Sequence, residues 1–169
     1  HWVKPEWMES IFGVVRLCPD VTFIFLTKRP LDLLRYSPFP GNAIIGATVC
    51  KQSMVKETIV GLSGIKAKTR MISFEPVMEE IHFPVAYDLS EIDWVIIGGW
   101  SRYSPKTAPK VEWITALVEA ADKAGAKVFL KDNVNKTIPY DSWSHAETIC
   151  RDGTGNLRQE TSCKERKVA

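Results

Sequence analysis

The chain has 169 residues, which favours one domain with a sizeable hydrophobic core. Its net charge of +2 excludes binding to nucleic acid or membrane through overall charge, so any basic site must be local. No apolar run approaches the ~20 residues of a transmembrane helix, and no signal-peptide pattern opens the chain. The four cysteines have no Cys-x-x-Cys spacing, so we expect reduced thiols and a cytoplasmic protein.

Apolar side chains alternate between helical and strand patterns along most of the chain. Apolar residues at helical spacing predict helices, several of which begin near a proline. Short apolar runs between turn residues predict buried strands. In chain order, the predicted elements are helix 5–17, strand 21–26, a short helix from residue 30, strand 43–49, helix 51–62, strand 70–74, an irregular stretch 78–91, strand 94–97, a polar loop 98–108, helix 109–125 and strand 127–130.

The order of these elements predicts the fold class. Strands that recur about every 20–30 residues, with helices between most of them, indicate a parallel sheet with right-handed crossovers. An open doubly wound sheet and part of a barrel both fit this pattern. We expect an α/β fold, the five-stranded parallel part of a TIM-type (β/α) barrel, over residues 1–139. The chain begins with His1 at the edge of a helix, which we interpret as a fragment or a processed chain.

Residues 140–169 break the β/α pattern and form a separate C-terminal tail in this prediction. The run from Asp152 to Asn156 is typical of a turn between two short extended pieces, so we expect an irregular tail or a short hairpin. The charged segment 164–167 is expected to be solvated or disordered.

Glu75 ends the stretch around which the chain is organised. The apolar run from Met71 to Phe74 stops at this carboxylate, and Pro76 cannot continue a sheet ladder. Ligands of α/β sheets bind at the C-terminal ends of the strands. Glu75 is therefore a candidate general base or ligand anchor. The alternative is a structural ion pair with a neighbouring strand end, for which Lys28 and Arg29 are the obvious partners.

Polar groups follow the other four strands in the same way. Lysine and arginine suit a phosphate or carboxylate, and paired glycines allow close approach of a ligand. Each set also has a purely structural alternative, as the start of a helix or as a tight turn. We predict catalytic roles for Glu75 and Lys28, and cofactor contacts for Thr27, Arg29, Thr48, Gly98, Gly99, Ser101, Lys131 and Asp132.

Other kinds of site have weaker patterns. The loop from Trp100 to Lys106 interleaves aromatic and basic residues, which favours single-stranded nucleic acid, a lid, or plain surface. The three histidines are isolated, so we expect no zinc site. Cys50 follows a strand and is either a thiolate nucleophile or a buried inert thiol.

Five motifs in a fixed order resemble one protein family. They are Phe-Leu-Thr-Lys-Arg-Pro at 25–30, Gly-Ala-Thr-Val at 46–49, Ser-Phe-Glu-Pro at 73–76, Asp-Trp-Val-Ile-Ile-Gly-Gly at 93–99 and Val-Phe-Leu-Lys at 128–131. This succession is similar to phage-type radical-SAM-like proteins of unknown function, distantly similar to spore photoproduct lyase. The match covers about residues 5–135. Cys50 and Trp100 stand where the family usually has glutamate, which removes two carboxylates from the expected pocket.

The resemblance implies a TIM-type barrel whose N-terminal part holds a [4Fe–4S] cluster for S-adenosylmethionine cleavage. The cysteines of this chain lack the spacing for such a cluster. Our leading hypothesis is the C-terminal half of a radical-SAM-like barrel. A non-catalytic binding module, with a small-molecule or nucleic-acid ligand, is the alternative. We expect the edge of strand 21–26 to be covered by a missing N-terminal segment or by self-association.

Overall fold

The computed structural model describes residues 3–84, 88–101, 104, 106–141 and 144–161. Most helices come before or between strands, as the sequence pattern predicts. The elements are helix α1 (Pro5–Leu17), strand β1 (Phe23–Thr27), 3-10 helix η1 (Pro30–Tyr36), β2 (Ala43–Thr48), 3-10 helix η2 (Gln52–Met54), α2 (Val55–Ser63), β3 (Thr69–Phe74), β4 (Trp94–Ile97), α3 (Val111–Ala124), β5 (Lys127–Leu130), 3-10 helix η4 (Asp132–Val134) and α4 (His145–Cys150).

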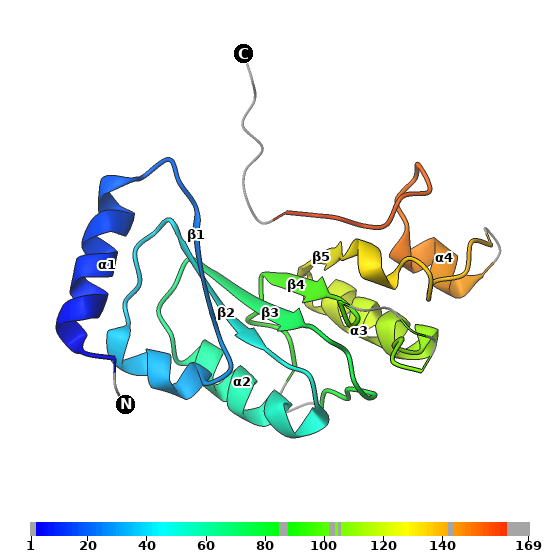
Figure 1. Cartoon of the computed structure of the whole chain (residues 1–169), viewed down its shortest axis with the longest axis horizontal. Coiled ribbons are helices and arrows are strands. Elements are labelled where there is room, and N and C mark those ends of the chain that lie inside the picture. The colour runs from blue at the N-terminus through cyan, green and yellow to red at the C-terminus, as the bar shows by residue number, and fades with distance from the viewer. Residues whose placement is uncertain (1–2, 85–87, 102–103, 105, 142–143, 162–169) are drawn as a thin grey trace, which may run out of the picture.

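The five strands form one parallel sheet in the order β1-β2-β3-β4-β5 (Figure 1). The predicted α/β class, the parallel pairing and the chain order are confirmed. The sheet is open, because β1 and β5 are its two edges and do not pair with each other. The structure therefore shows an α/β fold with an open five-stranded parallel sheet, and the assignment of this sheet to part of a TIM-type barrel stays a prediction.

The two faces of the sheet bury different sets of side chains. One face packs against the helices in the main core, where Phe12 of α1 meets Phe25 of β1 edge-on at 6.1 Å between ring centres. The opposite face carries a second, smaller cluster of Ile44, Met71 and Trp94 with Ile96 and Phe129 against it. No helix residue belongs to this second cluster, so within the described residues the helices cover the sheet on one side.

The ends of one predicted helix agree with the proline and glycine that predicted them, whereas another predicted helix is split in two. The last predicted helix begins at Val111, after Pro109, and ends at Ala124. Gly125 caps it, with a φ of 73° in the left-handed region that favours glycine. The helix predicted over 51–62 is instead split into η2 and α2. At this point the Gln52 side chain is hydrogen-bonded to the segment beyond β3. Its Oε1 accepts from His82 N–H at 2.7 Å, and its Nε2 donates to the His82 carbonyl at 3.0 Å.

The tail forms the expected turn but does not stay apart from the sheet. Arg151 and Leu157 make an antiparallel bridge around the turn, as predicted for a hairpin. Residues 157–161, here named the C-terminal strap, then run antiparallel along the outer edge of β5 (orange to red in Figure 1). Leu130 N–H donates to the Arg158 carbonyl at 2.7 Å, and Glu160 N–H donates to the Val128 carbonyl at 2.9 Å. The charged segment 164–167 lies outside the described residues.

None of the described helices is both long and apolar enough to cross a membrane.

Candidate functional site

Glu75 and Lys131 meet at the C-terminal edge of the sheet. Glu75 follows β3 and Lys131 follows β5, and the Lys131 ammonium donates to Glu75 Oε1 at 2.6 Å. Both side chains remain partly exposed, at 26% for Glu75 and 42% for Lys131. The ion pair is therefore held in place by the sheet and is still accessible to a small molecule.

Gly98, at the end of the strand between them, makes room for this ion pair. A Cβ at Gly98 would lie 3.1 Å from Lys131 Cδ and 3.2 Å from Glu75 Cδ, closer than ordinary van der Waals contact. The backbone of Gly98 is fixed on both sides, donating to the Phe74 carbonyl at 2.9 Å and accepting from Val77 N–H at 3.0 Å. Glycine at this position lets the two long side chains cross the end of β4.

Asn133 fixes the next glycine. Its side-chain amide accepts from Gly99 N–H at 3.0 Å and donates to the Gly99 carbonyl at 2.9 Å, so it satisfies both backbone groups. This arrangement extends the pairing of β4 and β5 beyond their last residues. Asn133 lies next to two predicted site residues in sequence, but no local pattern indicates that its amide would face a glycine 34 positions earlier.

Three further groups lie at the ends of β2 and β3. Thr48 and Ser73 are partners in the parallel ladder and both are buried. The Cys50 thiol donates to the Glu75 carbonyl at 3.3 Å. Burial raises the pKa of this thiol above its ordinary value, and the positive charge of Lys28 only partly opposes that rise. A raised pKa favours the buried inert thiol over the thiolate nucleophile as the role of Cys50.

The residues after β1 mostly serve the start of η1. Thr27 Oγ1 accepts from Arg29 N–H at 3.0 Å, and the Arg29 guanidinium pairs with Asp32 at 2.9 Å. This is the structural alternative for Thr27 and Arg29. Lys28 is exposed. Its positive charge acts on Cys50, which follows β2. Among the described residues, Glu75 has an ion pair with Lys131 and none with Lys28.

The remaining predicted site residues lie apart from the Glu75–Lys131 pair. Asp132 begins η4 and accepts from Gln159 Nε2 of the strap at 2.8 Å. Ser101 is exposed at the start of the loop after Gly99. Residues 102, 103 and 105 of the predicted nucleic-acid loop lie outside the described residues. The roles assigned from sequence to all these residues stay predictions.

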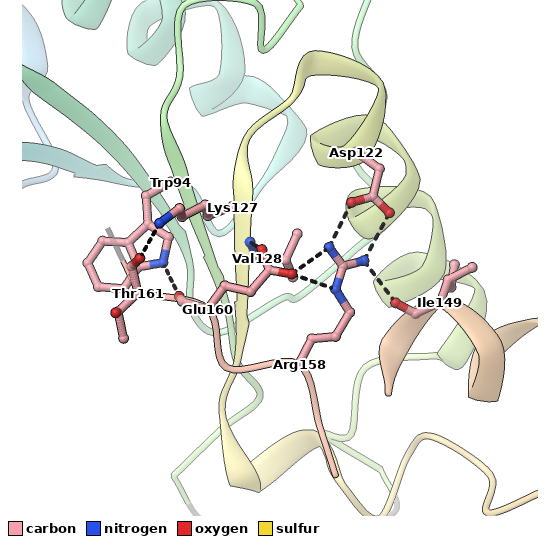
Figure 2. A network of polar contacts seen from close by, with 8 residues as sticks. All are labelled: Trp94, Asp122, Lys127, Val128, Ile149, Arg158, Glu160 and Thr161. Carbon is pink, nitrogen blue, oxygen red and sulfur yellow. Dashed lines mark hydrogen bonds and ion pairs between the residues drawn. The ribbon is translucent and has the colours of Figure 1, made fainter. Parts of the chain in front are cut away.

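A network that the sequence analysis missed lies at the β5 edge (Figure 2). The Arg158 guanidinium lies between Asp122 of α3 and Glu160, and the Trp94 indole N–H donates to the Glu160 carbonyl at 2.9 Å. Asp122 and Glu160 raise the pKa of Arg158 further above its already high value, chiefly through the hydrogen bonds to Asp122. The only sequence signal was an arginine in a polar stretch, which does not identify a partner 36 residues away.

The cavity beside this network is lined by two arginines that already have carboxylate partners. It has a volume of about 540 Å³ and is lined by residues of η4, the hairpin and the strap, including Arg151 and Arg158. Arg151 pairs with Glu147 at 2.8 Å, and Arg158 pairs with Asp122 at 2.8 Å. Because both guanidinium groups already have carboxylate partners, they are not available as an anion-binding pair.

The described residues hold no group of three or more His, Cys, Asp and Glu side chains that would bind a metal ion. Cys50 and Cys150 are buried at separate places, after β2 and at the end of α4, and Cys18 follows α1. These thiols do not fit the ligand set of an iron–sulfur cluster.

A family model described as a protein of unknown function, DUF5131, matches residues 1–155. The chain belongs to the DUF5131 family. No curated protein and no solved structure matches it. Because the DUF5131 description carries no activity, the radical-SAM resemblance of the sequence stays a hypothesis. The DUF5131 match extends past β5 to the hairpin, so the region beyond residue 135 is part of the family pattern.

Proposed function

We propose that the chain is the C-terminal part of a radical-SAM-like (β/α) barrel and that the ends of β3, β4 and β5 bind S-adenosylmethionine. The observation that carries this proposal is the partly exposed ion pair in which Lys131 Nζ lies 2.6 Å from Glu75 Oε1. The two side chains meet over Gly98. It lies at the edge of a parallel sheet where α/β proteins bind their ligands.

The chemistry of the pair suits a zwitterion. In the free protein the carboxylate and the ammonium neutralise each other. The amino-acid end of S-adenosylmethionine presents the same two charges, so its carboxylate would bind Lys131 and its ammonium would bind Glu75. Exchanging one ion pair for two leaves no charge unpartnered, which keeps the cost of desolvation low. The apolar face that carries Met71 and Ile96 leads up to this edge and would contact the less polar part of the ligand.

In this proposal the cluster is supplied from outside the described residues, whose thiols do not fit it. Beside a [4Fe–4S] cluster, S-adenosylmethionine supplies radical chemistry. The residues of this chain bind and orient the ligand, and Asn133 keeps the Gly98–Gly99 backbone rigid beneath it.

Titration of ¹⁵N-labelled protein with S-adenosylmethionine tests the proposal, using amide chemical shifts as the readout. We expect saturable shifts at Gly98 and Gly99, and a loss of affinity of about tenfold or more in Glu75→Gln because one charge-assisted bond is removed. Glu57→Gln, an exposed carboxylate on α2, is the matched control and leaves the affinity unchanged.

Two results would count against the proposal. One is the absence of saturable shifts at Gly98 and Gly99. The other is shifts confined to the loop from Trp100 to Lys106 on addition of a single-stranded oligonucleotide, which favours the non-catalytic, nucleic-acid-binding alternative.

A further inference from the structure

Thr48 and Ser73 place two hydroxyl groups side by side near the C-terminal edge of the sheet. They are partners in the ladder between β2 and β3, and they are only 7% and 4% exposed. Within the described part of the chain, neither hydroxyl has a hydrogen-bond partner. Burying a hydroxyl without a partner costs free energy, so native proteins rarely do this without a reason. The fold alone does not supply that reason for either residue.

Both hydroxyls lie on the face of the sheet opposite the described helices. Side chains alternate between the two faces along a strand. Thr48 is four residues after Ile44, and Ser73 is two residues after Met71; both apolar residues belong to the second cluster on that face. Glu75 follows Ser73 by two residues, so the same alternation directs it to this face. β2 and β3 are inner strands, so the strands on both sides of the two hydroxyls are β1 and β4 of this chain.

The oxygen atoms of these hydroxyls remain accessible. Among the described residues that are not exposed, only Thr137 has a side-chain nitrogen or oxygen atom that lacks both a hydrogen-bond partner and contact with solvent. The hydroxyl oxygens of Thr48 and Ser73 also lack a partner, so they keep some contact with solvent. A ligand atom can therefore reach them.

A positive charge without a carboxylate partner lies beside the hydroxyls. Lys28 follows the last residue of β1, so it is at the level of Thr48 in the ladder. Of the charged groups that act on the pKa of the Cys50 thiol, just beyond Thr48, Lys28 has the largest effect. Lys28 has no ion pair with the described residues, and the carboxylate of Glu75 is already neutralised by Lys131. Lys28 and the two hydroxyls together suit an anion.

We infer that Lys28, Thr48 and Ser73 bind a phosphate group. Two hydroxyls on neighbouring strands, ~4.8 Å apart, can donate to two oxygens of one tetrahedral anion. The lysine ammonium supplies the opposite charge. The phosphate belongs to the substrate that lies beside S-adenosylmethionine, and this assignment rests on the proposed function. The site itself uses neither Glu75 nor Lys131, so phosphate binding is measured separately from S-adenosylmethionine binding.

Titration of the ¹⁵N-labelled chain with inorganic phosphate, with sodium chloride keeping the ionic strength constant, tests the site. We expect saturable amide shifts at Thr48 and Ser73. Thr48→Val keeps the shape of the side chain and removes its hydroxyl, so it should raise the dissociation constant about tenfold. Lys28→Gln should raise it at least as much. Because the Thr48 hydroxyl has no partner in the free protein, Thr48→Val should not lower the melting temperature.

Lys66→Gln is the matched control, because Lys66 is an exposed lysine just before β3, at the opposite end of the sheet. It leaves the affinity for phosphate unchanged. Shifts that do not saturate overturn the inference, and so does an affinity that Thr48→Val leaves unchanged. A loss of affinity in Lys66→Gln as large as in Lys28→Gln also overturns it, because phosphate is then attracted only by surface charge. Circular dichroism verifies that each variant is folded.

Two further ligands identify the source of the phosphate. Adenosine 5′-monophosphate carries a phosphate monoester, and a dinucleotide carries a diester. Tighter binding of either one than of inorganic phosphate supports a substrate of that class, whereas weaker binding of both overturns the assignment to a substrate.

Titration of the same samples with S-adenosylmethionine keeps the two claims apart. Phosphate binding without S-adenosylmethionine shifts at Gly98 and Gly99 supports this site and counts against the proposed function. Shifts at Gly98 and Gly99 without phosphate binding support the proposed function and overturn this inference.

Discussion

The guanidinium of Arg158 donates to both carboxylate oxygens of Asp122, at 2.9 and 2.8 Å. It also donates to Glu160 and to the Ile149 carbonyl (Figure 2). One side chain of the strap thereby links the strap to α3 and α4. The Arg158 side chain is 17% exposed, so its bonds are shielded from water and are worth more than those of a surface pair.

Arg158→Ala should lower the free energy of unfolding by about 1–3 kcal/mol, because it removes a bidentate ion pair and a carbonyl contact together. Urea unfolding followed by circular dichroism measures this change. Arg16→Ala is the matched control, since the Arg16–Glu9 pair is exposed at 56% and 74% and should contribute less than about 0.5 kcal/mol. Equal losses in the two variants would mean that the strap contributes no special stability.

Stability should fall at alkaline pH because of Cys150. Burial raises the pKa of its thiol from 9.0 to about 11 in the folded protein. The unfolded chain therefore releases the thiol proton first, so this contribution to stability is complete below pH 9 and is lost as the pH rises towards 11. At pH 10 we expect a loss of about 1 kcal/mol relative to pH 8.

Urea unfolding across this pH range should show a flatter profile in Cys150→Ala than in the wild type. Cys18→Ala is the control for removal of a thiol outside the core, and it should keep the slope. If the stability of Cys150→Ala fell with pH as steeply as that of the wild type, the loss at alkaline pH would not come from the Cys150 thiol.

Gly98→Ala should separate stability from ligand binding. The added Cβ would lie 3.1 Å from Lys131 Cδ. The flexible side chains of Lys131 and Glu75 can move away at a cost below about 1 kcal/mol. This movement takes them out of the geometry of their ion pair. We expect a nearly unchanged melting temperature and an affinity for S-adenosylmethionine lowered about tenfold. In the control Gly41→Ala a Cβ meets nothing within 4 Å, so neither property changes.

Asn133→Asp should loosen the backbone at Gly99. Aspartate keeps an acceptor for Gly99 N–H but loses the donor to the Gly99 carbonyl, and a buried carbonyl left unpaired costs about 1–3 kcal/mol. Hydrogen exchange should therefore be faster at Gly99 in the variant while exchange at Val95, in the middle of β4, changes little. Unchanged protection of Gly99 would show that the bond from the Asn133 amide to the Gly99 carbonyl is not needed to hold this backbone.

The inner strands could be predicted from the sequence because they are largely buried on both faces, as in β2, where every residue is buried. Runs such as those at 94–97 and 127–130 are short, apolar and bounded by turn residues, and their bounds agree with β4 and β5. Parallel order followed from the helices between most of the strands. Glu75 and Lys131 could be placed at one edge for the same reason, since every strand of a parallel sheet ends on the same side.

The sequence does not indicate which residues far apart in the chain become partners in ion pairs or in strand pairing. The sequence analysis names Lys28 and Arg29 as ion-pair partners for Glu75, but in the structure Glu75 pairs with Lys131 across Gly98. The pairing of the strap with β5 was not predicted, because its polar residues have no apolar alternation and the Arg158–Asp122 pair joins residues 36 positions apart. Whether the sheet closes is also a long-range property that no local pattern determines.

Isothermal titration with two related ligands tests the central claim, that the Glu75–Lys131 pair recognises a zwitterion. S-adenosylmethionine carries the amino-acid group, and 5′-methylthioadenosine lacks it. We predict that the wild type binds S-adenosylmethionine at least about tenfold more tightly, and that Lys131→Gln binds the two ligands alike because the carboxylate contact is gone. Equal binding of the two ligands by the wild type, or a preference that survives Lys131→Gln, would contradict the claim.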